Sequence, residues 1–390
     1  MKEKIPEKIL EKDSLEYLKR CYNSQALLQK LPFSFWEEKL KQGALRFFLW
    51  KDKFFFRFNR EFKGFPLGTF FNDEIFVFGY PHIPRIYTLK TGIKRYLQYP
   101  FYVEEKIEGY NVRLVKVKDE ILAFTRRGYV CPFATDRWED FLKDLPQFFE
   151  KHPGLVVCCE VAGPENPFVS EYPPYIKEDV NFFVFDFMKI GKMEFLKPSE
   201  KYVLLEKYNF SSPEINGPFH PISDYETIYS LIKRYHFEGK EGVVFKPEKE
   251  GKVIKYVTPY SNIEDVKICL PFLGDIDPNY ISLRIIRLIL NLLEFKELRK
   301  EILNSAGKEL FERVLLELEK EEPIQEVFRV RFKKETNFNA LIAHFKSARI
   351  SIEIKSKEWK NGYLFVEFSK SYHRATHFWK QKIEGWGEVD

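Results

Sequence analysis

Lys106 follows an alternating apolar segment and lies just before a Glu-Gly turn, in the stretch Glu104-Glu105-Lys106-Ile107-Glu108-Gly109. An amine attacks only in its uncharged form, and the ordinary pKa of a lysine is about 10.4. Burial or neighbouring cations lower that pKa and make a lysine a nucleophile near neutral pH. Basic residues that could do so recur at Arg113, Arg126, Arg127, Lys246 and Lys255. The segment therefore makes Lys106 a candidate for covalent catalysis.

Three other predicted strands carry residue types that such chemistry could use. Glu160 follows the apolar run 155–159, Phe185-Asp186 follows the run 181–184, and Glu241-Gly242 precedes a further short strand. Taken singly, a carboxylate at a strand end is usually solvated, and a phenylalanine usually packs in the core. The order and spacing of these residues behind Lys106 favour a single site.

The elements that must position these residues are mostly short strands separated by turns. Helices are expected near residues 136–150 and 224–237. Many short strands with few helices favour an antiparallel α+β domain over a doubly wound parallel sheet. The expected strands are 75–80, 102–107, 111–117, 121–127, 155–163, 181–188, 242–247 and 252–257.

The segments on either side of this core have different patterns. Residues 1–30 read as amphipathic helix, and residues 45–62 as an aromatic hairpin that turns at residues 51–53. Beyond Pro271 the apolar spacing is helical, and a hairpin with Asn361-Gly362 at its turn follows. We expect four domains: an N-terminal α+β domain (1–74), a catalytic domain (75–265), a helical domain (266–322) and a C-terminal domain (323–390).

Composition narrows the class of protein. A length of 390 residues suits two to four domains. A net charge of +5 indicates a local basic groove rather than a polycationic coat. Five cysteines are too few and too odd in number for a disulfide scaffold, which indicates a reducing compartment. The charged N-terminus lacks a signal core, and Arg284 and Arg287 interrupt the most apolar run. We expect a cytoplasmic protein without a membrane segment.

These motifs together resemble those of the covalent nucleotidyltransferases, the superfamily of ATP-dependent ligases and mRNA capping enzymes. Residues 106–113, with the pattern Lys-x-Glu-Gly-x-Asn-x-Arg, resemble the nucleophile motif, and residues 125–128 resemble the arginine motif. Within the superfamily, the phrases EEKIEGYNVR, TRRGYVCPF, GPENPFV and KYVTPY are similar to those of the archaeal-type homodimeric ATP-dependent RNA ligases. This likeness extends over nearly the whole chain.

The resemblance implies an α+β fold built on an antiparallel-sheet nucleotidyltransferase core of the ATP-grasp-like ligase type. It implies that Lys106 attacks ATP to form a lysyl-adenylate, that AMP passes to an RNA 5′-phosphate, and that a 3′-hydroxyl then displaces AMP. The expected substrate is single-stranded RNA with these two ends, joined or circularised, and adenylated DNA is a further candidate. A homodimer is also expected, formed through the C-terminal domain.

The resemblance also assigns roles to individual residues. Lys246 and Lys255 would act with Lys106 by stabilising charge on the α-phosphate. Glu160 and Glu241 would hold Mg²⁺ or Mn²⁺. Phe185 would stack on adenine, Glu104 would accept from the adenine amino group, and Arg126 would hold the ribose or the acceptor phosphate. The full nucleotide-binding set is Glu104, Glu105, Lys106, Asn111, Arg113, Arg126, Glu160, Phe185, Glu241, Lys246 and Lys255.

Several alternatives stay open. Val257 stands where many members of the superfamily have a second lysine, and chemistry does not distinguish Arg126 from Arg127. A DNA ligase or capping guanylyltransferase would carry an oligonucleotide-binding barrel after the last strand, where this chain predicts helices and a hairpin. A non-catalytic nucleic-acid-binding protein would require an accidental lysine motif. His373 and His377 have zinc-ligand spacing but lack an evident third ligand.

Overall fold

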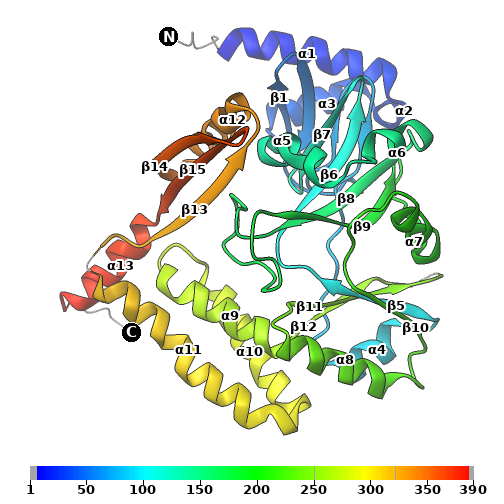
Figure 1. Ribbon diagram of the computed structural model, residues 1–390. Helices are drawn as coiled ribbons and strands as arrows, with labels where there is room; N and C mark the ends of the chain where they lie inside the picture. The colour runs from blue at the N-terminus through cyan, green and yellow to red at the C-terminus, as the bar shows by residue number, and fades with distance from the viewer. Residues whose placement is uncertain (1–6, 250, 321, 386–390) are drawn as a thin grey trace. The chain divides into compact units, whose positions relative to one another are not determined.

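The computed structural model describes residues 7–249, 251–320 and 322–385 (Figure 1). The chain forms two compact units and passes repeatedly between them. The first unit comprises the chain up to His82, Tyr110–Val161 and Phe182–Ser212, and the second comprises Ile83–Gly109, Ala162–Asn181 and the chain from Pro213 onward. The expected α+β class with antiparallel sheets is confirmed. The division into four domains stays a prediction about which segments fold alone.

The N-terminal part of the first unit is a four-stranded sheet rich in phenylalanine. The predicted hairpin is present, and Lys51 at its turn has a φ of 53°. Phe55, Phe56 and Phe58 are buried, so the aromatic residues of the second strand form core. The elements are α1 (Glu7–Ser24), α2 (Ala26–Gln29), α3 (Phe33–Lys41), β1 (Leu45–Trp50), β2 (Lys53–Phe58), β3 (Phe70–Phe71) and β4 (Phe76–Val77).

A second four-stranded sheet of the first unit has the order β7-β6-β8-β9. The one helix expected near residues 136–150 is in fact two, because Pro146 lies in the first turn of a new helix, where its missing amide hydrogen costs little. The elements are β6 (Tyr110–Val117), β7 (Glu120–Thr125), α5 (Pro132–Phe141), α6 (Leu145–Lys151), β8 (Leu155–Ala162), β9 (Asn181–Lys189) and α7 (Pro198–Lys207).

The second unit contains a four-stranded sheet of order β10-β5-β11-β12. One face of this sheet is apolar: Phe101, Val103, Phe245, Ile254 and Tyr256 are buried in a core that helices α4 and α8 share. Because side chains alternate along a strand, the residues between these core positions on β5, β11 and β12 point to the opposite face of the sheet. The elements are α4 (Leu89–Tyr96), β5 (Phe101–Lys106), β10 (Ile215–Phe219), α8 (Tyr225–Phe237), β11 (Gly242–Pro247) and β12 (Ile254–Val257).

The predicted helical segment follows as α9 (Pro259–Cys269), the short 3₁₀ turn η1 (Leu270–Phe272), α10 (Pro278–Glu294), η2 (Lys296–Leu298) and α11 (Arg299–Glu319). Arg284 and Arg287, which interrupt the apolar run at residues 281–295, contact other residues of the same chain. Arg284 pairs with Asp265 at 2.8 Å, and Arg287 donates to Asn262 Oδ1 at 3.4 Å. Among the described residues, no helix has the length and apolar character needed to cross a bilayer.

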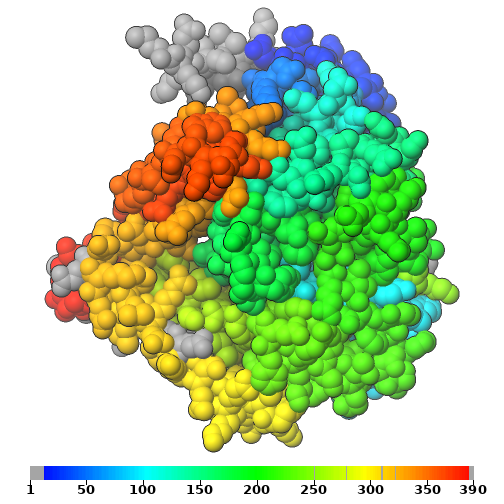
Figure 2. Space-filling model, in the orientation of Figure 1, coloured from blue at the N-terminus to red at the C-terminus, as the bar shows by residue number. Residues whose placement is uncertain are grey.

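The chain ends in a module that we call the C-terminal module, residues 324–385. Its three-stranded sheet has the order β13-β15-β14, and the predicted hairpin turns at Asn361 and Gly362, which both have positive φ. Figure 2 shows the red-orange side chains of this hairpin at the surface. β13 and the two helices had no predicted counterpart. The elements are β13 (Gln325–Phe332), α12 (Glu335–Ser347), β14 (Ser351–Lys360), β15 (Tyr363–Ser371) and α13 (His373–Ile383).

Lys370 on β15 is a buried lysine, 7% exposed, whose pKa burial lowers to about 8. An unfolded lysine has a pKa of about 10.4, so between these two pH values the unfolded chain binds the extra proton and stability rises with pH. We therefore expect Lys370→Met to raise the free energy of unfolding at pH 7 by roughly 1–3 kcal/mol, and the gain to vanish by about pH 10.

Urea unfolding of wild type and variant at both pH values measures this difference. The exposed Lys116→Met, on β6, is the matched control and should change stability little at either pH. A Lys370→Met chain that is less stable than wild type at pH 7 would contradict the expectation.

Candidate active site

The polar face of the β5-β11-β12 sheet carries four of the predicted site residues. Because side chains alternate along a strand, Glu104 and Lys106 point away from the apolar core that Val103 enters. The strand register places Lys246 on the same face as Glu104 and Lys106, and it pairs Lys255 with Val244, which also lies on that face. The structure thus brings together the three lysines predicted to act on the α-phosphate.

Gly242 allows this arrangement. It lies opposite Lys106 on β5 and opposite Val257 on β12. A Cβ at this position would lie 2.2 Å from the carbonyl oxygen of Tyr256, too close for any side chain. The glycine of the Glu-Gly pair is therefore required for close pairing of β11 with β12, the strand that carries Lys255.

Lys106 is held by Glu241. The Lys106 ammonium donates a hydrogen bond to a carboxylate oxygen of Glu241, and the two side chains are 21% and 8% exposed. Glu241 directly precedes β11, so the contact joins the strand of the nucleophile to its neighbour. The ion pair holds the Lys106 ammonium against the Glu241 carboxylate.

Glu104 and Lys246 form a second ion pair on this face, with 2.9 Å between Lys246 Nζ and Glu104 Oε2. The side chains of Lys246 and Glu104 are 6% and 2% exposed, so both charges are removed from water. Such a pair costs desolvation free energy, and losing one partner costs more than the pair contributes. The carboxylate of Glu104 therefore fixes the Lys246 ammonium close to the strand that bears the nucleophile.

Glu105 points to the opposite side of β5. Its carboxylate accepts a hydrogen bond from the Tyr175 hydroxyl at 2.7 Å and pairs with Lys240 at 3.2 Å. Burial raises the pKa of Glu105. The alternation of the strand thus separates Glu105 from Lys106, and its carboxylate serves a buried network on the far face of the sheet.

In the first unit, Asn111 and Glu160 lie opposite each other on β6 and β8. Both are half-buried, and Asn111 Oδ1 accepts no hydrogen bond from the described part of the chain. A buried acceptor without a donor is uncommon and fits a site that a ligand completes. Asn111 is therefore a candidate for a direct contact with a ligand.

Arg113 follows two residues later and is fully buried. Its guanidinium donates to the carbonyl oxygens of Gly68 at 2.8 Å and Thr125 at 2.9 Å, and also to that of Phe78. Burial lowers the pKa of Arg113 to about 10. The side chain therefore ties three backbone segments together beneath the arginine motif.

Arg126 and Arg127 follow β7. The side chain of Arg126 is half-buried and that of Arg127 is exposed. Arg57 holds the turn that contains these two arginines, because its guanidinium donates to the carbonyl oxygen of Arg127 at 3.1 Å. The backbone of both arginines is thus anchored, and the structure does not distinguish which of the two is the functional one.

Phe185 is half-buried in a strand whose neighbouring residues on both sides are buried. Its ring meets that of Tyr80 edge to face, with 5.3 Å between centroids. Asp186 accepts from the Tyr80 hydroxyl at 2.5 Å, and Lys201 donates to the carbonyl oxygen of Phe185 at 2.9 Å. Tyr80 and Lys201, which the sequence did not single out, thus fix the ring in place.

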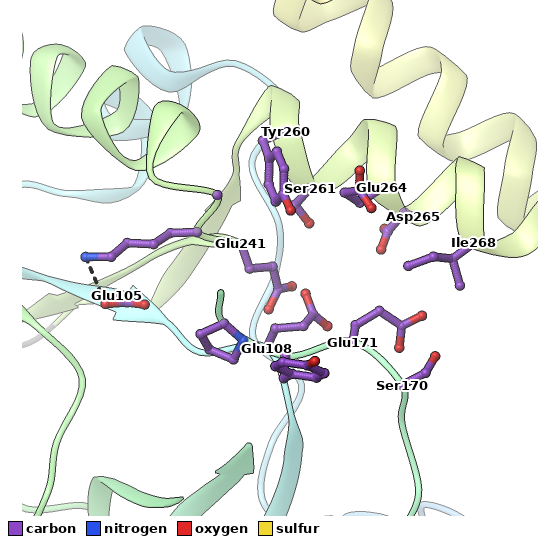
Figure 3. Close-up of a pocket in the computed structure, with 14 residues that line it drawn as sticks. Glu105, Glu108, Ser170, Glu171, Glu241, Tyr260, Ser261, Glu264, Asp265 and Ile268 are labelled. Atoms are coloured by element: carbon purple, nitrogen blue, oxygen red, sulfur yellow. Dashed lines mark ion pairs between the residues drawn. The ribbon is translucent and has the colours of Figure 1, made fainter. Parts of the chain in front are cut away.

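A cavity of about 190 Å³ lies beside Glu241 in the second unit (Figure 3). Figure 3 shows the carboxyl groups of Glu108 and Glu241 pointing toward each other. Burial, and next the charge of Glu241, raise the pKa of Glu108, and burial also raises the pKa of Glu171 and of Asp265. The acidic lining residues are Glu105, Glu108, Glu171, Glu241, Glu264 and Asp265, with Lys240 as the basic one.

The expected metal ligands do not form a preformed cage. Within residues 7–249, 251–320 and 322–385, no three His, Cys, Asp or Glu side chains are grouped so that they could hold a metal ion. His373 and His377, the zinc alternative, both lie exposed on α13. The zinc hypothesis therefore has no support in the described structure.

Comparison with known proteins identifies the family. Residues 99–257 match the model of the RNA ligase family, and residues 268–386 match that of the ligase Pab1020 C-terminal region. An uncharacterized protein of Methanocaldococcus jannaschii is 32% identical over 315 residues, covering 77% of this chain and 79% of that protein. The chain belongs to the RNA ligase family and carries a C-terminal region of the Pab1020 type.

Solved structures agree on the fold. A putative ATP-dependent DNA ligase from Aquifex aeolicus is 37% identical, with a TM-score of 0.86 over 92% of this chain and 100% of that one. An archaeal ATP-dependent RNA ligase is 23% identical, with a TM-score of 0.86 over 95% of this chain and 99% of that one. The expected class of enzyme, a ligase, is thereby confirmed.

Proposed function

We propose that this ligase seals RNA through a lysyl-adenylate formed on Lys106. The observation that carries the proposal is the common sheet face of Lys106, Lys246 and Lys255, with Glu241 bound to the amine of Lys106. A nucleophile on one sheet face with two cations suits attack on a phosphate, where negative charge builds on the oxygens in the transition state. The three lysines on this sheet face therefore favour phosphoryl transfer over nucleotide binding alone.

In the first step Lys106 Nζ bonds to the α-phosphorus of ATP, the bond to the pyrophosphate oxygen breaks, and Nζ loses its proton. Lys246 and Lys255 stabilise the charge on the α-phosphate oxygens. In the second step a 5′-phosphate oxygen of RNA displaces Lys106 from the AMP phosphorus. In the third, an RNA 3′-hydroxyl attacks the activated 5′-phosphate and AMP leaves, which forms the phosphodiester.

The local geometry supports the proposed nucleotide contacts. The ring of Phe185, which Tyr80 contacts edge to face, suits stacking on adenine. Asn111 Oδ1 is proposed to accept a hydrogen bond from the nucleotide. Glu104 carries a carboxylate with about four acceptor positions and pairs with Lys246. Arg126, with Arg127 as the alternative, would hold the ribose or the acceptor phosphate. Arg113 and Glu105 stay proposed members of the nucleotide-binding set; Arg113 donates to backbone carbonyl oxygens, and Glu105 is held by Tyr175 and Lys240.

Mg²⁺ or Mn²⁺ would neutralise charge on the transferred phosphate. Glu241 and Glu160 are the proposed ligands, and carboxylate oxygens are the donors that such cations prefer. Mg²⁺ usually binds through one or two carboxylates, waters and substrate phosphates. The carboxylate-rich wall around Glu241 adds negative potential that favours a cation there.

The substrate is tested with two matched polymers. We expect the wild-type protein to seal single-stranded RNA with a 5′-phosphate and a 3′-hydroxyl, as circles or joined strands, at least about tenfold faster than a nicked DNA duplex. Gel electrophoresis of labelled substrate measures both rates. Faster sealing of nicked DNA would favour the second candidate function, a DNA ligase, which is the activity that the similar Aquifex aeolicus protein is named for.

We propose that the protein is a cytoplasmic homodimer, and that the C-terminal module forms the interface. β14 is the edge strand of its sheet and is almost wholly exposed, with Ile354 at 45% and Trp359 at 52% exposure. Exposed apolar groups on an open edge favour association. The five cysteines are free thiols, which suits a reducing compartment.

Sedimentation velocity tests the dimer. We expect wild type to sediment as a dimer and the double variant Ile354→Lys/Trp359→Glu to sediment as a monomer, because it places charges in the proposed interface. Ile289→Lys, on the exposed face of α10, is the matched control and should leave the dimer intact. A monomeric wild type, or a double variant that stays dimeric, would rule out this interface.

A further inference from the structure

The segment from Gly163 to Val180, which we call the connecting loop, joins β8 to β9 and contains neither helix nor strand. Connections of this length without regular structure are uncommon in compact domains and are usually functional. Its residues belong to the second unit, together with β5 and the C-terminal module. The connecting loop is therefore expected to have a functional role.

Arg331 of β13 clamps both ends of the connecting loop. Its guanidinium donates through Nε and Nη2 to the two carboxylate oxygens of Glu165, and Nη1 lies 3.5 Å from Asp179. The loop closes on itself there, because the amide of Glu165 donates to the carbonyl oxygen of Asp179 at 3.2 Å. A guanidinium fork on a carboxylate fixes orientation as well as distance.

Lys370 of β15 binds the connecting loop at a second point. Its ammonium donates to the carbonyl oxygen of Pro167 at 2.8 Å and lies 3.9 Å from the ring centroid of Phe328. Ser170 of the loop donates to Glu326 of β13 at 2.9 Å. A buried lysine costs stability, so its presence here is better explained by what it holds than by what it contributes to folding.

The same loop reaches the strand of the nucleophile. The Tyr175 hydroxyl donates to Glu105 at 2.7 Å, and Glu105 directly precedes Lys106. Loop residues 170–173 also line the cavity next to Glu241. One continuous segment thus contacts the C-terminal module, the residue before Lys106 and the wall beside its carboxylate partner.

We propose that the C-terminal module positions the Lys106–Glu241 pair through the connecting loop, with Arg331, Lys370 and Tyr175 as positioning residues for self-adenylation. The proposal rests on the lysyl-adenylate function proposed above. It makes the C-terminal module part of the catalytic apparatus for the first step, in addition to any role in association. A misplacement of about 1 Å can cost on the order of a hundredfold in rate.

The test is single-turnover labelling of the full-length protein with α-labelled ATP, measured across ATP concentrations. We expect Lys370→Met, Arg331→Met and Tyr175→Phe each to slow labelling at saturating ATP by about tenfold to a hundredfold, with KM for ATP nearly unchanged. Arg331→Lys should recover part of the rate, because it keeps the charge but loses the fork. Lys370→Met combined with Tyr175→Phe should lose little more than either alone, because both break one linkage.

Arg329→Met is the matched control, since Arg329 lies on the same strand but pairs with Glu367 inside the C-terminal module. It should label at the wild-type rate. Lys370→Met should be slow while its Tm is at least that of wild type, a combination that a purely structural role would not give. Variants that label at the wild-type rate overturn the positioning role, whereas a wild-type protein that takes no label overturns the proposed function itself.

Discussion

Lys106→Ala is expected to abolish covalent labelling by ATP, with a loss of roughly a thousandfold or more in the first step. In the proposed mechanism this side chain supplies the attacking nitrogen, so its removal leaves no atom to carry AMP. Lys106→Arg should be equally inactive, because a guanidinium stays protonated and does not attack. Gel analysis of the denatured protein after incubation with α-labelled ATP measures the loss.

The last step provides the control for Lys106. Sealing of RNA that is already adenylated needs no lysyl-adenylate, so Lys106→Ala should still carry out this reaction. The variant should also unfold near the wild-type midpoint. A Lys106→Ala protein that retains covalent AMP would show that a different residue is the nucleophile.

Lys246→Met is expected to destabilise the protein by about 3–5 kcal/mol, because it leaves the buried carboxylate of Glu104 without its lysine. The double variant Lys246→Met/Glu104→Leu removes both charges, so it should recover most of that stability. Activity should not return in the double variant, since the cation proposed for the α-phosphate is missing. Urea unfolding and the labelling assay, run on the same three proteins, separate the two effects.

Two outcomes would contradict these roles of the pair. A single Lys246→Met variant as stable as wild type would show that Glu104 does not depend on the lysine. A double variant that labels at the wild-type rate would show that Lys246 has no part in the chemistry. In the second case Lys255 would be the remaining candidate for the α-phosphate contact.

The local parts of the fold could be read from the sequence. Alternation along the predicted strands is enough to place Glu104 and Lys106 on one face, and turn residues located the hairpins at Lys51 and at Asn361-Gly362. The same alternation puts Glu105 on the opposite face. Its place among the nucleotide contacts is implied by motif resemblance and stays a prediction.

The rest depends on contacts between distant segments. The acidic cavity gathers Glu108, Glu171 and Asp265 from a turn, a loop and a helix, and no short pattern links them. Arg331 and Lys370 look like ordinary strand cations in the sequence, and only the folded chain shows them holding the connecting loop. Pairing between remote segments is where local pattern carries little information.

The most direct test of the lysyl-adenylate on Lys106 is to locate the label. The wild-type protein is incubated with α-labelled ATP or, separately, α-labelled GTP, then denatured and digested, and the modified peptide is identified by mass spectrometry. We predict AMP on the peptide that contains Lys106, and no label from GTP. AMP on another residue, or no covalent nucleotide at all, would contradict the proposed mechanism.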